Sequence, residues 1–401
     1  MDENNTGKAT GLSSDPFIFF SVLTLVIVIL FGALINIQMT GAILFFLQDF
    51  IVGNFSWLFS LTVTFLLLFS IWLACSRFAH VKLGGDNSKP DFSLTGWLSM
   101  LFSAGMGIGL VFFGVAEPVL HFVAPPVSEP ETSAAAREAM RLSIFHWGLH
   151  AWAIYVVLGL SLGLGAAQIN AGLSELFQTE ISTNSQVLII ILITFFAIMS
   201  LVLGLDKGIR RLSEFNMVLA VLLLTFILIL GPTAALLRGL PDHLGNYLQN
   251  LPGMSLSTHP FQSLDWQKAW TIFYWAWWLS WAPFVGTFIA RISKGRTIRE
   301  FVIGVLVAPT LMGLLWFGIF GGAALRHELL GGGGIAEIVE QNSALAIYAL
   351  LAQFPLQQFT NLVAIILVAV FFITSSDSGS FVVDMLTSGG DPNPPVWQRI
   401  F

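Results

Sequence analysis

The stretch Ser103-Ala104-Gly105-Met106-Gly107-Ile108-Gly109-Leu110 lies inside an apolar segment that runs from about residue 94 to residue 116. Each of its three alternate glycines weakens a helix by roughly 1 kcal/mol relative to alanine. Such glycines either let a neighbouring helix approach closely or mark a helix that unwinds, so that its freed carbonyls line a site. The spacing i, i+2, i+4 covers more than one helix face and leaves both explanations open. The stretch predicts a helix that is either closely approached by a neighbour or broken.

The composition is that of a membrane protein. The 401 residues are 56% hydrophobic and 10% charged, with a mean hydropathy of +0.82. A soluble domain carries about 25% charged residues, so an ordinary soluble enzyme is excluded. The net charge of −6 argues against nucleic acid as a partner and leaves the lipid bilayer as the expected surroundings. The fold class predicted from these values is an all-α polytopic membrane protein.

Apolar stretches long enough to span a bilayer, about 20 residues each, recur along the whole chain. The first is too long for a signal peptide and follows the acidic residues Asp2 and Glu3, so an uncleaved helix is expected. Residues 1–15 then form a cytoplasmic tail, and residues 16–401 form one membrane domain. The nine predicted spans are residues 16–37, 54–76, 94–116, 143–168, 186–205, 213–238, 270–291, 300–325 and 359–383.

Basic loops are expected on the cytoplasmic side of the membrane. Most of the basic residues fall in loops 77–89, 207–211 and 291–299, whereas loops 117–135 and 171–185 have glutamates but no Lys or Arg. Three predicted spans separate the first two basic loops, although two loops on one side require an even number. Either one loop departs from the rule, or a helix is missing between about Tyr155 and Asn170.

A tryptophan-rich stretch suggests a cation site. Six of the 13 tryptophans fall between Trp266 and Trp281, and Trp270, Tyr274, Trp277 and Trp281 share one helix face. An interfacial aromatic belt explains those near the helix end but not those at mid-span. Tryptophan faces attract cations, and quaternary ammonium groups are recognised in this way. The stretch therefore predicts an aromatic cage.

A second aromatic patch surrounds two histidines. His146 and His150 lie one helical turn apart and could ligate a metal, yet no third ligand with suitable spacing is near. We therefore expect these histidines to be packed or hydrogen-bonded. Trp147, Trp152 and Tyr155 would complete the cage if they face the first aromatic stretch.

A hydroxyl-rich stretch near the C-terminal end could hold a monovalent cation. Five Ser or Thr residues and Asp377 fall within Thr374–Ser380. Hydroxyls in a membrane helix often bond to their own backbone, but this density also suits Na⁺, which prefers hard oxygen ligands. No second carboxylate is near Asp377, which argues against a dedicated Ca²⁺ site.

The remaining polar stretches predict no catalytic site. Glu117 is expected to be exposed at the external membrane boundary, and residues 240–266 to form an external loop or interfacial helix. Gly331–Gly334 predicts a flexible loop without the lysine of a phosphate-binding loop. No Ser-His-Asp or Cys-His set is legible, so neither enzymatic activity nor an organic cofactor is expected.

At three of these places the chain resembles the betaine/carnitine/choline transporter family. The resemblance covers about residues 16 to 390. The matching stretches are Gly105-Met106-Gly107-Ile108-Gly109 through Gly114-Val115-Ala116-Glu117-Pro118, Trp270-Thr271-Ile272-Phe273-Tyr274-Trp275-Ala276-Trp277-Trp278 through Arg291-Ile292-Ser293-Lys294-Gly295-Arg296, and Thr374-Ser375-Ser376-Asp377-Ser378-Gly379.

The resemblance implies a transporter core of two inverted five-helix repeats, preceded by two peripheral helices. Here the peripheral helices would occupy residues 16–76, the shortened first repeat 94–238 and the truncated second repeat 270–401. Such carriers move compatible solutes with a quaternary ammonium, driven by Na⁺, by H⁺ or by exchange. The resemblance also implies a homotrimer in the bacterial inner membrane, with a cytoplasmic N-terminus.

Site residues follow from the same resemblance. The substrate would lie beside the cage at Gly105, Met106, Gly107 and Gly109. At the position of Gly109 the proton-coupled choline carriers of the family tend to have Asp, so in this respect the chain resembles the Na⁺-coupled betaine carriers. A sodium site would use Ser103, Met106, Phe371, Thr374 and Ser375. The cage would comprise Trp147, Trp152, Tyr155 and Trp278, with Trp275, Trp277 and Trp281 along the path and Phe288 at the cytoplasmic exit.

Two departures from the family pattern qualify this expectation. After Leu160 the sequence continues as if a helix and a loop, about 50 residues, had been removed. Ile154 and Leu158 stand where the family's second sodium site has hydroxyls, and the last two helices of the family are not matched. The expected function is Na⁺-coupled import of glycine betaine. Choline, carnitine, ectoine or a sulfonium osmolyte as substrate, and a non-transporting deletion product, remain alternatives.

Overall fold

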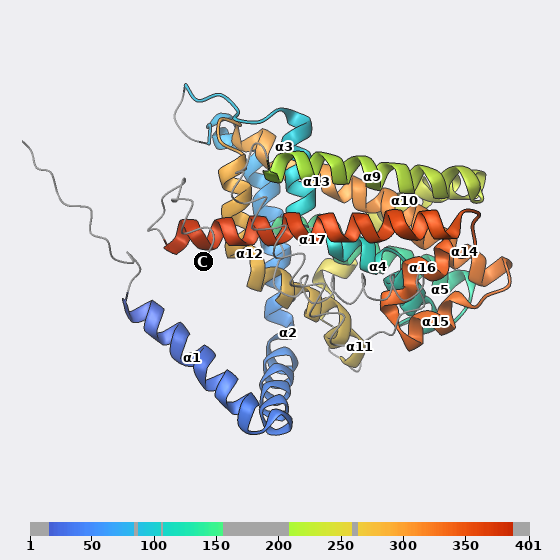
Figure 1. Cartoon of the computed structure of the whole chain (residues 1–401), viewed down its shortest axis with the longest axis horizontal. Coiled ribbons are helices and arrows are strands. Elements are labelled where there is room, and N and C mark those ends of the chain that lie inside the picture. Colours follow the sequence, from blue (N-terminus) through green and yellow to red (C-terminus); the bar gives the residue numbers. More distant parts are fainter. Residues whose placement is uncertain (1–15, 84–86, 106, 155–207, 259–263, 388–401) are drawn as a thin grey trace, which may run out of the picture.

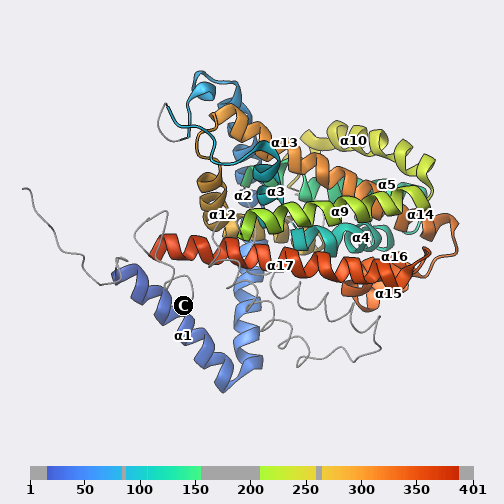
Figure 2. The same cartoon turned by 45° about the horizontal axis from the view of Figure 1, so that its top comes forward.

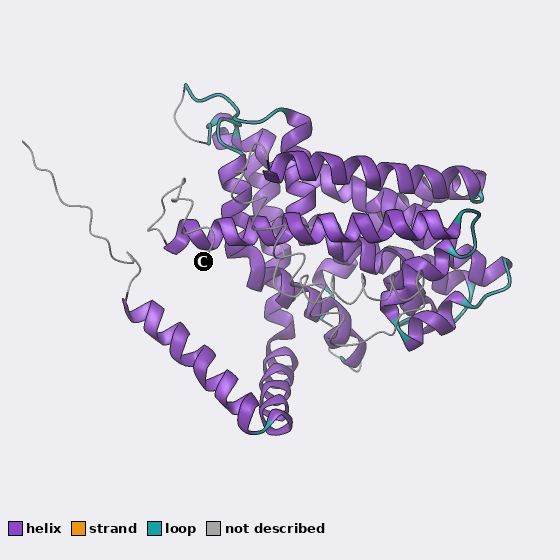
Figure 3. Cartoon of the chain, in the orientation of Figure 1, coloured by secondary structure: helices purple, strands orange, loops and turns teal. Residues whose placement is uncertain are grey.

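The computed structural model of the whole chain describes residues 16–83, 87–105, 107–154, 208–258 and 264–387. Within these residues the chain is helical and contains no strand, as Figure 3 shows. This confirms the prediction of an all-α protein. The elements are α1 (Pro16–Ile35), α2 (Ile37–Cys75), η1 (Arg77–His80), α3 (Leu94–Gly105), α4 (Gly107–Val123), α5 (Ser133–Trp147), α6 (Leu149–Ile154), α9 (Arg210–Leu230), α10 (Thr233–Leu256), α11 (Asp265–Gln267), η3 (Lys268–Ile272), α12 (Phe273–Ile292), α13 (Ile298–Trp316), η4 (Phe317–Gly321), α14 (Gly322–Leu330), α15 (Ile335–Gln341), η5 (Ser343–Leu345), α16 (Ala346–Leu351) and α17 (Gln357–Thr387).

Several of these helices are long and apolar enough to cross a membrane. By length and composition four helices in the described residues qualify, or five if the bent pair α3 and α4 is one span. The four are Ile37–Cys75, Arg210–Leu230, Ile298–Leu330 and Gln357–Ser380. The predicted span 186–205 and most of 143–168 lie outside the described residues. The predicted number of nine spans therefore stays a prediction.

Helix α2 is longer than the sequence suggested. The predicted span began at residue 54, whereas α2 begins at Ile37, directly after α1, and has 39 residues. Asn36 caps it, because its side chain accepts a hydrogen bond of 2.9 Å from the Met39 amide. At 1.5 Å per residue α2 is about 58 Å long, which exceeds the roughly 30 Å of a bilayer core. In Figures 1 and 2, α1 extends from the far end of α2, away from the other helices.

The glycine-rich stretch interrupts a helix, as one of its two explanations required. Helix α3 ends at Gly105, α4 begins at Gly107, and the two helices are bent by 62° relative to one another. Met106 lies outside the described residues. The break is placed deep in the molecule, because the residues on both sides of it are buried.

The predicted span 213–238 is two helices rather than one. Helix α9 ends at Leu230, and α10 begins at Thr233 after Gly231 and Pro232. Proline has no amide hydrogen to donate, so the break falls where the helix can end without losing a backbone bond. Most of segment 240–266 continues as α10. Helix α9 packs alongside α17 and α3, and Figures 1 and 2 show α9 and α17 side by side.

The three basic segments lie at the same end of the molecule. The Leu83 amide donates to the Arg296 carbonyl at 2.8 Å, and the Gly295 amide donates to the Leu83 carbonyl at 2.7 Å. The Arg296 guanidinium lies 4.1 Å over the Trp97 ring. A Cβ added to Gly96 would lie 3.2 Å from Arg210, which places the start of α9 beside the start of α3. The shared end agrees with the prediction that these segments face one side of the membrane.

Candidate substrate site

Aromatic rings pack directly on the three alternate glycines beside the helix break. A Cβ added to any of them would lie closer than 3.0 Å to a ring, which real side chains essentially never do. Both explanations of the glycines therefore apply, because the helix is broken and neighbouring rings also approach it closely. The pairs are Gly105 with Trp152, Gly107 with Phe371 and Gly109 with Trp147.

Four aromatic side chains converge beside Gly109, and we call Trp147, Tyr274, Trp277 and Trp278 the aromatic cluster. The ring centroids of Trp147 and Trp278 are 5.1 Å apart, and those of Trp277 and Trp278 are 4.7 Å apart. Tyr274 lies 5.6 Å from Trp147 and 5.5 Å from Trp278. The rings therefore contact one another, and the two aromatic stretches face each other as the cage prediction required.

The other predicted cage residues lie around this cluster or outside the described residues. Trp275 points the other way and stacks on His150 with centroids 5.6 Å apart. Trp152 is buried against Gly105, and Phe288 is buried in α12. Trp281 is half-buried against the core. Tyr155 lies outside the described residues.

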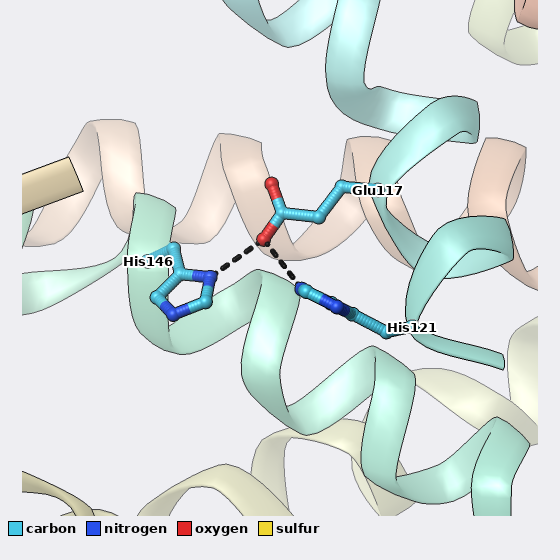
Figure 4. Close-up of side chains that lie close together, drawn as sticks. All are labelled: Glu117, His121 and His146. Carbon is cyan, nitrogen blue, oxygen red and sulfur yellow. Dashed lines mark hydrogen bonds and ion pairs between the residues drawn. The ribbon is translucent and has the colours of Figure 1, made fainter. Parts of the chain in front are cut away.

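The prediction that Glu117 is exposed at the membrane boundary is wrong. Its side chain is completely buried on α4, and Figure 4 shows His121 and His146 directed at the same carboxylate oxygen. Oε1 is 2.7 Å from Nδ1 of His146 and 3.2 Å from Nε2 of His121. The burial follows from the position of Glu117 in α4, which packs against α5. A carboxylate near a predicted span end is thus held inside the protein.

The second oxygen of Glu117 binds two members of the aromatic cluster. The Trp147 indole donates to Oε2 at 2.7 Å, and the Tyr274 hydroxyl donates to it at 2.6 Å. The Trp278 indole donates to the His146 carbonyl at 3.1 Å. Three rings of the aromatic cluster are therefore fixed by hydrogen bonds to Glu117 or to the residue beside it.

Both predicted histidines are hydrogen-bonded, as expected. Nε2 of His146 is 3.0 Å from the Thr271 hydroxyl, and Nε2 of His150 is 3.0 Å from the Ser255 hydroxyl. His146 also belongs to a set that could hold a metal, with Glu117 and His121, whose ligand atoms all lie within 4.8 Å of one another. Two histidines and a carboxylate are a ligand set that Zn²⁺ accepts. In this structure the three side chains are joined by hydrogen bonds to one another and to Thr271, Trp147 and Tyr274.

The residues of the predicted sodium site lie near the helix break. The Ser375 hydroxyl donates to the Ser103 carbonyl at 3.3 Å, which joins α17 to α3. The Thr374 hydroxyl bonds back to the Phe371 carbonyl at 3.0 Å. The Ser103 hydroxyl is buried and has no hydrogen-bond partner in the described part of the chain. Met106 lies outside the described residues.

Sequence reasoning missed the network around Glu117, although two signals were present. Glu117 and His121 are separated by four residues and therefore share one helix face. An ionisable side chain within a membrane segment also marks a functional site by default. The other partners come from α5, η3 and α12. No spacing within one helix reveals these contacts.

Comparisons with a family profile and with individual known proteins point to the same family. The profile of the BCCT, betaine/carnitine/choline family transporters, matches residues 17–162 and 158–401. The glycine betaine transporter of Acinetobacter baylyi is 42% identical over 405 aligned positions, which cover 88% of this chain and 61% of that protein. The chain thus spans less than two thirds of that relative's length.

Two further relatives give similar values. The glycine betaine transporter OpuD of Bacillus subtilis is 42% identical, over 86% of this chain and 77% of its own. The high-affinity choline transport protein of Escherichia coli is 38% identical, over 88% of this chain and 60% of its own. The chain therefore belongs to the betaine/carnitine/choline family of membrane transporters, and it is not an enzyme, as the sequence predicts.

Proposed function

We propose that this protein is a secondary active transporter that imports a quaternary-ammonium compatible solute, glycine betaine first, together with Na⁺. The observation that carries the proposal is the meeting of the aromatic cluster with the broken helix. Trp147 packs on Gly109, and Trp277 and Trp278 stand beside it. The names of the relatives, which include glycine betaine and choline transporters, support the same substrate class.

The chemistry of the cluster suits a trimethylammonium group. Such a cation has no hydrogen to donate, so ring faces and apolar contacts are what can recognise it. The rings of the cluster touch one another, so we expect them to part when the substrate enters. The carboxylate of glycine betaine would meet the start of α4 at Gly107, where helical amides are unpaired and the helix dipole favours negative charge.

Sodium coupling would use the same break. We place Na⁺ between the backbone oxygens of Ser103, Met106 and Phe371 and the hydroxyls of Thr374 and Ser375. Two observations support this placement: the contact of Ser375 with the Ser103 carbonyl, and the Ser103 hydroxyl, which has no partner among the described residues. An ion held between α3 and α17 stabilises the conformation in which the substrate site is formed. Ion and substrate then favour each other's binding by linkage.

Uptake of labelled glycine betaine tests the proposal. The chain would be produced in a bacterium without its own osmolyte carriers and given a hyperosmotic shock in Na⁺ or in K⁺ medium. We expect uptake in Na⁺ only, and its loss in Trp278→Ala. Trp57→Ala, on the exposed face of α2, is the matched control and should transport normally. Sodium-independent uptake, or unchanged affinity in Trp278→Ala, would contradict the proposal.

A second candidate, a non-transporting deletion product, rests on the alignments. The Acinetobacter alignment has 405 positions yet covers 88% of these 401 residues, so about 50 positions have no counterpart in this chain. This agrees with the helix and loop that the sequence pattern lacks after Leu160. Absence of uptake by a chain that is present in the membrane would favour this candidate.

Setting and assembly extend the proposal. We place the protein in a bacterial inner membrane, with the basic segments and the N-terminus in the cytoplasm, because basic loops are retained on that side. A homotrimer follows from the family resemblance. Choline, carnitine, ectoine and sulfonium osmolytes remain alternative substrates, since a ring face reads the cationic head and not the rest of the molecule.

A further inference from the structure

Glu117 is a fully buried charge that lies outside the predicted substrate and sodium residues and has several polar partners among the described residues. An ionised carboxylate has about four acceptor positions. Here four groups lie within 3.2 Å of its two oxygens: the His121 and His146 rings, the Trp147 indole and the Tyr274 hydroxyl. A carboxylate surrounded in this way is held in one orientation, and so are the groups that donate to it.

The donors of Glu117 include residues that would touch the substrate. Trp147 and Tyr274 belong to the aromatic cluster, and both donate to the same oxygen, Oε2. His146, held through Oε1, presents its backbone carbonyl to the Trp278 indole. Substrate recognition by ring faces requires those faces at fixed angles. The position of one carboxylate therefore sets the angles of three rings.

The charge of Glu117 has a second consequence. The carboxylate lies at the indole nitrogen of Trp147, and the ring centroids of Tyr274 and Trp278 lie 5.6 Å and 5.1 Å from that of Trp147. In a low-dielectric interior a negative charge at this distance attracts a cation on the ring face. Hydrogen-bond donation to an anion also polarises the donor groups. Both effects favour a cationic head group over an uncharged one.

We infer that Glu117 is a positioning residue of the substrate site, which fixes the rings of Trp147 and Tyr274 and supplies the negative charge that favours a cationic head group. This inference rests on the proposed function, because it assigns the aromatic cluster to the substrate. It goes beyond the cage itself, since Glu117 lies behind the rings. The hydrogen bonds that join Glu117 to His121 and His146 explain why these three side chains lie so close together.

A double-mutant cycle tests the inference. Tyr274→Phe keeps the ring and removes only the hydroxyl that donates to Glu117, and Glu117→Gln keeps the shape and removes the charge. The dissociation constant for glycine betaine would be measured by intrinsic tryptophan fluorescence on the purified chain. We expect it to rise about tenfold in Glu117→Gln and about fivefold in Tyr274→Phe. The double variant should stay near fifteenfold, because both changes break one interaction.

The matched control is a buried glutamate elsewhere. Glu138 on α5 is also buried, but it accepts from the Ser128 amide and from Arg141, away from the aromatic cluster. Glu138→Gln should bind glycine betaine as the unmodified chain does. In uptake, Glu117→Gln should raise the half-saturating substrate concentration and leave the maximal rate within about threefold. A merely structural defect would lower the maximal rate instead.

Two outcomes would overturn the inference. One is a dissociation constant in Glu117→Gln within twofold of the unmodified chain. The other is an effect near fiftyfold in the double variant, since independent effects multiply.

The proposed function and the inference can fail separately. If the unmodified chain binds no glycine betaine, the proposed function fails, and the cycle is then read from thermal unfolding midpoints and the near-ultraviolet circular dichroism of the tryptophans. Non-additive midpoints with a changed tryptophan signal in Glu117→Gln would uphold the positioning role. Additive midpoints with an unchanged signal would overturn it.

Discussion

Single residues around the helix break carry most of the site, and Gly109 is the clearest of them. Its hydrogen faces the Trp147 ring at a distance that leaves no room for a methyl group. Any side chain there must displace a ring that Glu117 also holds. Gly109 therefore sets the position of the aromatic cluster relative to the start of α4.

Substituting this glycine should be costly. Overpacking a well-packed interior costs about 1–3 kcal/mol, so Gly109→Ala should lower the thermal unfolding midpoint in detergent and weaken binding of glycine betaine. Gly245→Ala is the control, because a Cβ at Gly245 meets nothing within 4 Å. Equal midpoints for the two variants would show that Trp147 does not pack on Gly109 as described.

The residues of the site were predictable to different degrees. The spacing of Gly105, Gly107 and Gly109 predicted either a break or a close approach, because both properties belong to one short segment, and the structure has both. The role of Glu117 was not predictable in this way. Its partners His146 and Tyr274 lie 29 and 157 residues away in sequence, and only the packing of α4 against α5 and α12 brings them together.

At the scale of elements, α3 and α17 meet where the proposed sodium site lies. Ser375 on α17 donates to the carbonyl of Ser103 on α3. Hydroxyl and carbonyl oxygens at the end of a broken helix are the groups that discontinuous transporter helices offer to ions. The two helices would therefore be joined by Na⁺ as well as by this hydrogen bond.

Removing the hydroxyl of Ser375 should weaken sodium binding specifically. We expect Ser375→Ala to raise the Na⁺ concentration for half-maximal uptake about tenfold, because one oxygen ligand is lost. Ser380→Ala, at an exposed position of the same helix, is the control and should leave the sodium dependence unchanged. The measurement is uptake of labelled glycine betaine against external Na⁺. An unchanged sodium dependence in Ser375→Ala would argue against this ion site.

Element boundaries were harder to predict than element type. Helix α2 continues through residues 37–53, which the predicted spans left out, because the Asn36 cap starts the helix directly after α1. The span predicted at 213–238 instead divides into two helices at Pro232, because this proline interrupts the apolar run. Apolar content therefore predicted helices correctly, but caps and prolines determined their ends.

At the scale of the whole molecule, the clustering of the basic segments constrains the topology. Segments near residues 83, 210 and 296 lie at one end, and an even number of crossings between any two of them is expected if that end faces one side of the membrane. Three spans were predicted between the first two segments. The parity and the roughly 50 unmatched alignment positions support, by separate routes, the proposal that this chain lacks one helix of its relatives.

Accessibility of single cysteines tests this arrangement. In a chain with Cys75→Ser, Asn87→Cys and Lys294→Cys should react with a membrane-impermeant maleimide in inside-out vesicles only. Glu129→Cys, beyond the other end of α4, should react in right-side-out vesicles only. All three positions are exposed. Reaction of Asn87→Cys and Lys294→Cys from opposite sides would contradict the shared end.

The most direct test of the central claim compares two ligands of the same shape. In 3,3-dimethylbutanoate a carbon replaces the quaternary nitrogen of glycine betaine, so the molecule keeps its form and its carboxylate but lacks the positive charge. Binding of each to the purified chain would be measured by tryptophan fluorescence in Na⁺. If the aromatic cluster recognises a cation, glycine betaine binds saturably and the isostere without the positive charge binds at least about 100-fold more weakly. Equal binding of the two would contradict the account.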